Sequence, residues 1–252
     1  MNAQGQAAIV TGGASGLGAA TASSLRGRGA SVAIVDADAD RAHEYAAEIG
    51  ALALTCDVRD GDSAERAVEA AREAHGPARI LVNCAGICLP NTVENATLED
   101  WHATLAVNVD GTFFGCQSAV AAMKDRGGAI VNFSSISGLA ANADMFAYDA
   151  SKGAVRGMTK EVATYCCARG YAIRCNSVHP GTIETPMVTG FFDEHSDDPS
   201  SWVAAQAIKR FGTPDEVAAM VAFLASDDSS FSTGAEFVID GGLMAGETQG
   251  WE

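Results

Sequence analysis

Short apolar runs of strand length recur along the chain, and segments long enough to form helices separate them. The runs lie near residues 7–11, 31–35, 51–55, 79–82, 129–134, 172–178 and 235–239. Strands that alternate with helices in this way are joined by right-handed crossovers, which make neighbouring strands parallel and place helices on both faces of the sheet. The sequence therefore predicts an α/β fold of the Rossmann type, a doubly wound parallel sheet of about seven strands.

The length and composition of the chain agree with one domain over residues 1–252. A chain of 252 residues with 48% hydrophobic residues can bury one large core. No internal repeat or low-complexity linker divides it. No apolar run approaches the roughly 20 residues that span a bilayer, and the first residues lack the basic and apolar regions of a secretory signal. We therefore expect a cytoplasmic protein without a membrane partner.

Charge and cysteine usage exclude several classes of partner. The net charge is −16, from 32 acidic and 16 basic side chains, which disfavours binding to nucleic acid or an anionic membrane. The seven cysteines lack the paired spacing of a zinc site, and the histidines are scattered, so we expect no metal. Cys84 and Cys88 bracket the loop after the fourth run, where a redox or ligand role is the alternative to simple packing.

A glycine-rich turn, T-G-G-A-S-G-L-G, follows the first predicted strand and precedes a predicted helix over residues 19–28. Gly12, Gly16 and Gly18 let the backbone bring amide groups against a pyrophosphate at the positive end of that helix. An ordinary glycine turn is the alternative. Asp36 ends the second predicted strand, where an acid that binds a ribose is expected, and this favours dinucleotide binding.

Tyr148 and Lys152 occur in the segment Y-D-A-S-K at the start of a long predicted helix. Residues one helical turn apart share a face, so the ammonium lies beside the phenol. A free phenol has a pKa near 10, and proton transfer at neutral pH needs a shift of roughly 3 units, or about 4 kcal/mol. A cation at about 4 Å in a partly buried site supplies energy of that order.

Three further motifs accompany the glycine turn, the acid and the Tyr–Lys pair: N-C-A-G at residues 83–86, Asn108, and Ser135 in V-N-F-S-S-I-S-G. Over nearly its whole length, the chain resembles the classical short-chain dehydrogenase/reductase (SDR) family. The resemblance implies an oxidoreductase that transfers a hydride between a nicotinamide dinucleotide and a small substrate.

The resemblance also implies four catalytic residues. Tyr148 is the general base in alcohol oxidation and the general acid in ketone reduction, and Lys152 lowers the pKa of Tyr148 and holds the nicotinamide ribose. Ser135 donates a hydrogen bond to the substrate oxygen. Asn108 supports a water chain from Lys152 to solvent, and the alternative for this residue is a buried Asn that kinks its helix.

The expected cofactor is NAD. A 2′-phosphate would place an anion beside Asp36, and NADP-preferring relatives carry a basic residue at the positions of Ala14 or Ala37. Arg41 is near enough in sequence to be tested. The resemblance assigns cofactor binding to Gly12, Ser15, Gly16, Leu17, Gly18, Asp36, Asp57, Val58, Asn83, Ala85, Gly86, Tyr148, Lys152, Pro180, Gly181, Ile183 and Thr185.

The expected substrate is a neutral secondary alcohol or its ketone, cyclic or bulky, because no Arg or Lys falls among the candidate pocket residues. These candidates are Ser137, Asn142, Met145, Met187, Phe191 and Phe192, with Ile87, Cys88, Leu89 and Trp202 beside them. The loop H-P-G-T-I-E-T-P-M is similar to that of hydroxysteroid dehydrogenases, although many family members share it. In this loop His179 is expected to have a packing role.

The segment over residues 184–210 breaks the strand–helix pattern, and we expect it to form a lid over the substrate, with an ordinary surface loop as the alternative. Family members are commonly homotetramers, and residues 148–169 and 101–123 would supply the subunit contacts. The C-terminal tail, with Trp251 as an anchor, would cover a neighbouring subunit or remain unstructured.

Two alternative functions remain open. A 3-oxoacyl reductase that receives its substrate on an acidic acyl carrier protein is disfavoured by the negative charge and by Asp36. A dinucleotide-binding regulator without turnover is disfavoured because Tyr148 and Lys152 are both present.

Overall fold

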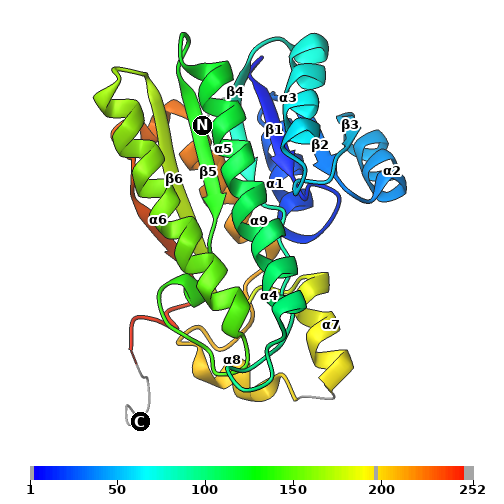
Figure 1. The fold of residues 1–252 in the computed structure, drawn as a ribbon, viewed down its shortest axis with the longest axis vertical. Helices are drawn as coiled ribbons and strands as arrows, with labels where there is room; N and C mark the ends of the chain where they lie inside the picture. Colours follow the sequence, from blue (N-terminus) through cyan, green and yellow to red (C-terminus); the bar gives the residue numbers. More distant parts are fainter. Residues whose placement is uncertain (1–2, 196–197, 247–252) are drawn as a thin grey trace.

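The computed structural model describes residues 3–195 and 198–246, which form a seven-stranded parallel sheet covered by helices (Figure 1). The strand order is β3-β2-β1-β4-β5-β6-β7. This confirms the predicted Rossmann-type fold. The strands are β1 (Ala7–Thr11), β2 (Ser31–Asp36), β3 (Leu52–Thr55), β4 (Ala78–Asn83), β5 (Gly128–Phe133), β6 (Ile173–Pro180) and β7 (Glu236–Ile239).

Helices connect successive strands and cover both faces of the sheet (Figure 1). Their starts and ends follow local sequence signals: Pro214 opens the last long helix behind a Thr213–Glu216 capping box, and Gly50 closes the second in a left-handed conformation. The helices are α1 (Gly16–Gly27), α2 (Ala39–Ile49), α3 (Gly61–His75), α4 (Leu98–Leu105), α5 (Gly111–Met123), α6 (Phe146–Ala168), α7 (Pro186–His195), α8 (Ser200–Ala205) and α9 (Pro214–Ala225).

The core lies in two layers because alternate residues of each strand point to opposite faces of the sheet. Val10 and Ile80 pack with α1, α2 and α9 on one face. Ile9 and Leu81 pack with α3, α5 and α6 on the other. Both faces are therefore dry, which explains why the strands read as continuous apolar runs in the sequence.

The direction of strand addition reverses at β1. From β1 the chain adds β2 and β3 on one side, and it then returns to add β4 to β7 on the other. The loops that leave β1 and β4 diverge at this point and open a crevice at the carboxyl ends of the strands. The glycine turn follows β1 and the N-C-A-G segment follows β4, so the fold brings both motifs to this crevice.

Two helices, α7 and α8, lie beyond the carboxyl ends of the strands, within the segment predicted as a lid (Figure 1). Aromatic contacts hold them together, because Phe191 and Phe192 of α7 both pack against Trp202 of α8. Trp251 lies outside the described residues. Within residues 3–195 and 198–246, no helix is long and apolar enough to span a membrane.

Candidate active site

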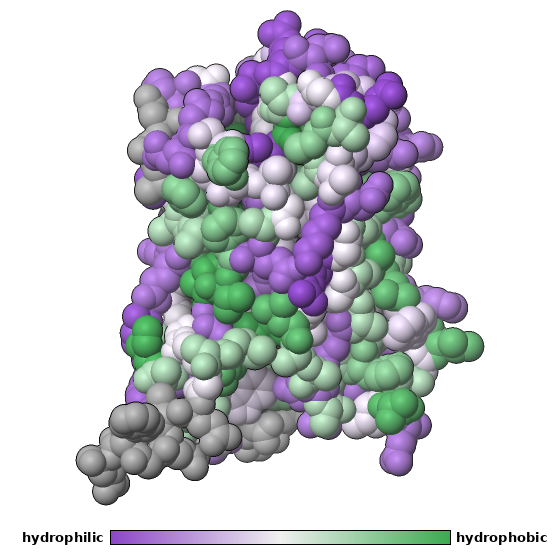
Figure 2. All heavy atoms as spheres, turned by 90° about the vertical axis from the view of Figure 1, so that its left-hand side faces the viewer, coloured by the Kyte–Doolittle hydropathy of each residue, from purple (hydrophilic) through white to green (hydrophobic). Residues whose placement is uncertain are grey.

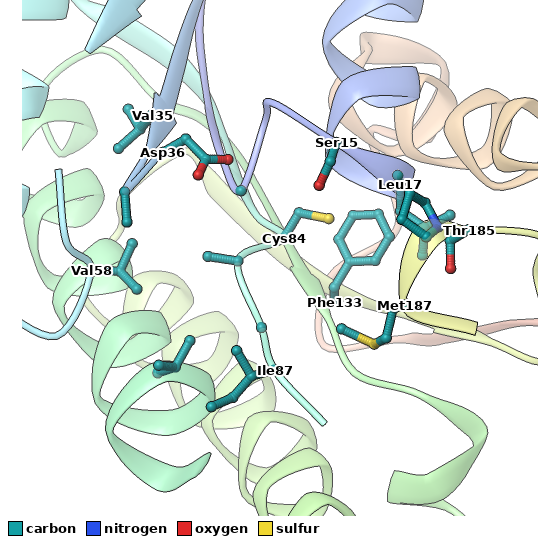
Figure 3. Close-up of a pocket in the computed structure, with 18 of the residues that line it drawn as sticks. Ser15, Leu17, Val35, Asp36, Val58, Cys84, Ile87, Phe133, Thr185 and Met187 are labelled. Atoms are coloured by element: carbon teal, nitrogen blue, oxygen red, sulfur yellow. The ribbon is translucent and has the colours of Figure 1, made fainter. Parts of the chain in front are cut away.

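A cavity of about 490 Å³ occupies the crevice between β1 and β4 (Figure 3). Asp36 and Val58 lie toward one end of it and Thr185 and Met187 toward the other, with Cys84 between them. The predicted cofactor residues that line this cavity are Gly12, Ser15, Gly16, Leu17, Gly18, Asp36, Asp57, Val58, Ala85, Gly86, Tyr148, Lys152 and Thr185.

The glycine turn is packed too closely for side chains. Gly12 has a φ of +64°, and a Cβ there would lie 2.7 Å from the Cα of Ala85. A Cβ on Gly18 would overlap the carbonyl oxygen of Gly12. The backbone between β1 and α1 therefore lies directly against the N-C-A-G segment and presents its amides at the start of α1, as pyrophosphate binding requires.

The carboxylate of Asp36 is held at the mouth of this turn. One of its oxygens accepts a hydrogen bond from the Ala14 amide at 3.1 Å, and the other accepts from the Asp38 amide at 3.1 Å. These bonds fix an anion beside the glycine turn in the cavity. The backbone of this chain therefore fits the adenosine side of a nicotinamide dinucleotide.

Arg59 also lines the cavity, and sequence analysis missed it. Its guanidinium pairs with Asp57 at 2.6 Å, and the hydrogen bonds from Arg59 lower the pKa of Asp57. The signal available in the sequence was a basic residue two positions after the predicted adenine contact. Arg41, which the sequence singled out, does not line this cavity.

Four predicted cofactor residues do not line the cavity. Asn83 is buried in the core, where its side-chain amide donates to Asn132 Oδ1 at 2.9 Å. Pro180 ends β6, and the neighbouring Gly181 lines a second cavity instead. Ile183 packs into the core with its side chain, whereas the predicted cofactor contact belongs to its backbone amide.

Tyr148 and Lys152 lie on one face of α6, as predicted. The ammonium of Lys152 is 5.4 Å from the centre of the Tyr148 ring and donates to the Phe133 carbonyl at 2.9 Å. Lys152 is only 5% exposed, and burial lowers its pKa to about 8. Tyr148 lines both cavities.

Without a bound cofactor, the pKa of Tyr148 is raised, whereas the sequence analysis expected Lys152 to lower it. Burial raises it, because a phenolate is destabilised away from water, and the hydrogen bond from the Ser135 hydroxyl lowers it by less. The ammonium of Lys152 donates to the Phe133 carbonyl.

Ser135 follows β5 and faces Tyr148. Its Oγ accepts a hydrogen bond from the Ser137 amide at 3.1 Å, so its own proton is directed elsewhere. Ser134, the preceding residue, points the other way, as predicted, and donates to the Lys152 carbonyl at 2.9 Å. Ser134 is thus bonded to α6, whereas Ser135 lines the second cavity.

Asn108 sits in a single π-helical turn, η1 (Ala106–Asp110), between α4 and α5. Its side chain bonds both the amide and the carbonyl of Ile87, each at 2.9 Å, and the Ser151 hydroxyl at 2.9 Å. The Asn108 carbonyl accepts from the Thr112 hydroxyl at 2.8 Å. These contacts tie the loop after β4 to η1 and α6.

A second cavity of about 470 Å³ adjoins the first and shares Tyr148, Gly86 and Met187 with it. None of its described lining residues is charged. Predicted pocket residues in its wall are Ile87, Cys88, Leu89, Ser137, Asn142, Met145, Met187, Phe191 and Trp202. Phe192 is the exception, because it is buried and stacks on Phe211 at 5.8 Å.

Three cysteines line the cavities, and two of them, Cys84 and Cys88, were singled out in the sequence. Cys84 lines the first cavity and Cys88 the second. Burial raises the pKa of Cys84 to about 12 and that of Cys88 to about 11. Raised pKa values favour the protonated thiols at neutral pH, which disfavours nucleophilic chemistry.

Fold, glycine turn and Tyr–Lys pair together define a nicotinamide-dependent oxidoreductase of the Rossmann type. The family model described as Enoyl-(Acyl carrier protein) reductase matches residues 12–244. The chain belongs to the classical short-chain dehydrogenase/reductase family.

The similarity to known proteins extends over nearly the whole chain. It is 40% identical over 248 residues to the NADP-dependent (R)-specific alcohol dehydrogenase of Lentilactobacillus kefiri, covering 96% of this chain and 98% of that one. It is 40% identical over 249 residues to the 3-alpha-(or 20-beta)-hydroxysteroid dehydrogenase of Mycobacterium bovis, covering 96% and 90%. A short-chain type dehydrogenase/reductase from Mycobacterium marinum, solved as a crystal structure, superposes with a TM-score of 0.90 at 32% identity, covering 97% and 98%.

Proposed function

We propose that this protein is an NAD(H)-dependent oxidoreductase that interconverts a neutral, apolar secondary alcohol, cyclic or bulky, and its ketone, with Tyr148 as general acid and base. The observation that carries this proposal is the position of Tyr148. It forms a shared wall between a cavity with the features of a dinucleotide site and a second cavity whose described lining is uncharged.

Ser135 and Tyr148 have different roles at the substrate oxygen. Ser135 donates a hydrogen bond to that oxygen while Tyr148 takes its proton in oxidation and returns it in reduction. The nicotinamide, when bound, supplies the hydride acceptor or donor and, in its oxidised form, a positive charge. Because the pKa of Tyr148 is raised in the chain alone, we expect oxidation to speed up and reduction to slow down as pH rises.

The preference for NAD rests on the charges at the adenosine end. The Asp36 carboxylate lies in the cavity, and the positions just before Ser15 of the glycine turn and just after Asp36 hold Ala14 and Ala37. The Lentilactobacillus kefiri relative is NADP-dependent, and Arg59 could attract a phosphate. However, Arg59 is engaged by Asp57, so repulsion from Asp36 dominates. The ratio of kcat/KM for NAD over NADP measures this directly, and a ratio below one contradicts it.

The substrate proposal rests on the second cavity. We propose a neutral substrate because a carboxylate or phosphate would find no cationic side chain in the described wall. The test is NADH formation at pH 9 with linear, cyclic and steroidal secondary alcohols. Each alcohol is paired with an analogue of similar size that carries a carboxylate. Faster turnover of the charged member of a pair would contradict the proposal.

We further propose that residues 184–210 act as a lid and that the chain works as a single-domain cytoplasmic enzyme. In support of the lid, Phe191 of α7 and Trp202 of α8 contribute side chains to the wall of the second cavity. Hydrogen–deuterium exchange with and without NADH checks it. Unchanged protection in this segment would favour the ordinary surface loop.

A homotetramer is proposed from apolar side chains on the outer helices. Phe113 of α5 and Phe146 and Tyr165 of α6 are all more than 40% exposed. Apolar side chains also gather at the middle of the face shown in Figure 2. Exposed apolar surface of this kind is typical of subunit contacts. Sedimentation of the purified protein at micromolar concentration gives the oligomeric state.

The alternative is a 3-oxoacyl reductase that uses an acyl carrier protein. The matching family description, Enoyl-(Acyl carrier protein) reductase, supports the carrier protein but names an enoyl group and not a 3-oxoacyl group. The charge of −16 opposes docking of an acidic carrier. Reduction of a carrier-bound 3-oxoacyl chain with NADPH, compared with the free ketone and NADH, separates the two. Binding of NADH without turnover of either would instead favour a dinucleotide-binding regulator.

A further inference from the structure

His179 is a fully buried histidine whose two ring nitrogens both have hydrogen-bond partners. It lies on β6, with its side chain 0% exposed. Its Nδ1 is 2.9 Å from the carbonyl oxygen of Ser135, and its Nε2 is 2.8 Å from the hydroxyl of Ser177. One imidazole therefore connects β6 to the backbone of the residue that faces Tyr148.

These contacts determine the tautomer of the ring. A carbonyl oxygen only accepts hydrogen bonds, so Nδ1 must carry the proton that reaches Ser135. Burial lowers the pKa of His179, which favours the neutral ring, and Nε2 then accepts from the Ser177 hydroxyl. The charged groups that act on the ring are Glu236, which raises its pKa, and Arg156 and Lys160, which lower it; both cations pair with Glu236.

Ser135 is held at both its backbone and its side chain. Its carbonyl accepts from the Gly138 amide at 3.0 Å as well as from His179, and its Oγ accepts from the Ser137 amide at 3.1 Å. The Gly138 and Ser137 contacts are local, within the short turn η2 (Ile136–Gly138). Of the contacts just described, only the one with His179 connects Ser135 to β6.

We propose that His179 is a positioning residue that orients the Ser135 hydroxyl toward the substrate oxygen through its Nδ1–H bond to the Ser135 carbonyl. The inference rests on the proposed function, because it assigns Ser135 a role on that oxygen. A simple packing role predicts that the size of the residue matters and that the placement of its donor does not. The proposal predicts the opposite.

Two substitutions separate the alternatives. In His179→Asn the side-chain amide nitrogen can take the place of Nδ1 and keep the donor to Ser135, whereas in His179→Gln the amide reaches the position of Nε2. We expect kcat to fall about 3-fold or less in H179N and roughly 100-fold in H179Q, because a small misplacement of a catalytic group has effects of that size. The dissociation constant for NADH is expected to stay within 2-fold in both variants.

Ser177→Ala is the matched control for the other ring nitrogen. It removes the partner of Nε2 and leaves the contact with Ser135, so we expect kcat to fall less than in H179Q. Equal losses in H179N and H179Q, or a larger loss in S177A than in H179Q, would overturn the proposal. Melting temperatures of all three variants show whether a loss comes from unfolding.

The tautomer of the His179 ring can be measured without enzyme turnover. In the ¹⁵N spectrum of the whole protein we expect the His179 ring to be protonated at Nδ1 and unprotonated at Nε2 at pH 7. Protonation at Nε2 alone would overturn the proposal even if no substrate were found. If Ser135→Ala retains full activity, the role of Ser135 in the proposed function fails. If S135A is inactive and H179Q is fully active, only the inference on His179 fails.

Discussion

The two cavities that meet at Tyr148 are built from different parts of the fold. The proposed dinucleotide cavity lies at the ends of β1, β2 and β4, where glycines after β1 and β4 allow close approach of the backbone. The substrate cavity is formed by side chains from the loops after β4, β5 and β6 and from α7 and α8. Strand ends are held by the buried sheet, whereas loops and short helices depend on their own contacts. The sheet therefore positions the glycine turn and Asp36, whereas loops and short helices form most of the wall of the second cavity.

Tyr148→Phe tests the point at which the two cavities meet, and we expect the largest effect there. Removal of the phenol oxygen eliminates proton transfer and should lower kcat by roughly 10³- to 10⁴-fold. NADH binding should change little, because the ring remains in the wall. Stopped-flow and fluorescence titration measure the two quantities. Retained turnover would contradict the mechanism.

Gly18→Ala tests whether the first cavity depends on backbone packing. The new Cβ would overlap the Gly12 carbonyl, so the turn must shift, and we expect NADH affinity to fall by roughly 100-fold or more. Gly27→Ala, in the same helix, is the control, because a Cβ there meets nothing within 4 Å. Equal NADH affinities in the two variants would show that the turn tolerates displacement.

Asp36→Ala tests the charge at the adenosine end. Loss of a charged hydrogen-bond partner is worth about 1.5–3 kcal/mol, so the preference for NAD over NADP should fall roughly 10- to 100-fold. Arg59→Ala is the companion variant, and it should weaken any residual use of NADP. If D36A leaves the preference for NAD over NADP unchanged, Asp36 does not discriminate between the two cofactors.

Phe191→Ala and Phe192→Ala test whether adjacent residues of α7 have separate roles. Phe191 lines the substrate cavity, and we expect kcat/KM for bulky alcohols to fall about 10-fold relative to small ones. Phe192 packs on Phe211, so its loss should lower the melting temperature without changing the order of substrates. The same substrate order in F191A as in the wild type would remove it from the specificity pocket.

The strands and the cofactor motif could be predicted because their signals are local. Buried parallel strands need continuous apolar runs, and the turn between β1 and α1 needs glycine wherever backbone approaches backbone. The sequence also placed Tyr148 and Lys152 on one helical face. It did not show that Asn83 would turn into the core or that Phe192 would pack away from the substrate, because neither side-chain direction is encoded by a motif.

The sequence by itself determined the sheet, the family and the shared helical face of Tyr148 and Lys152, since each depends on motifs or spacing along a strand or helix. Only the tertiary structure decided the state and support of those groups. Burial from all sides raises the pKa of Tyr148 and lowers that of Lys152. Contacts between distant segments bring Arg59 to the cofactor cavity and His179 to the carbonyl of Ser135. Desolvation and hydrogen bonding across the fold depend on three-dimensional surroundings, which spacing along the chain does not specify.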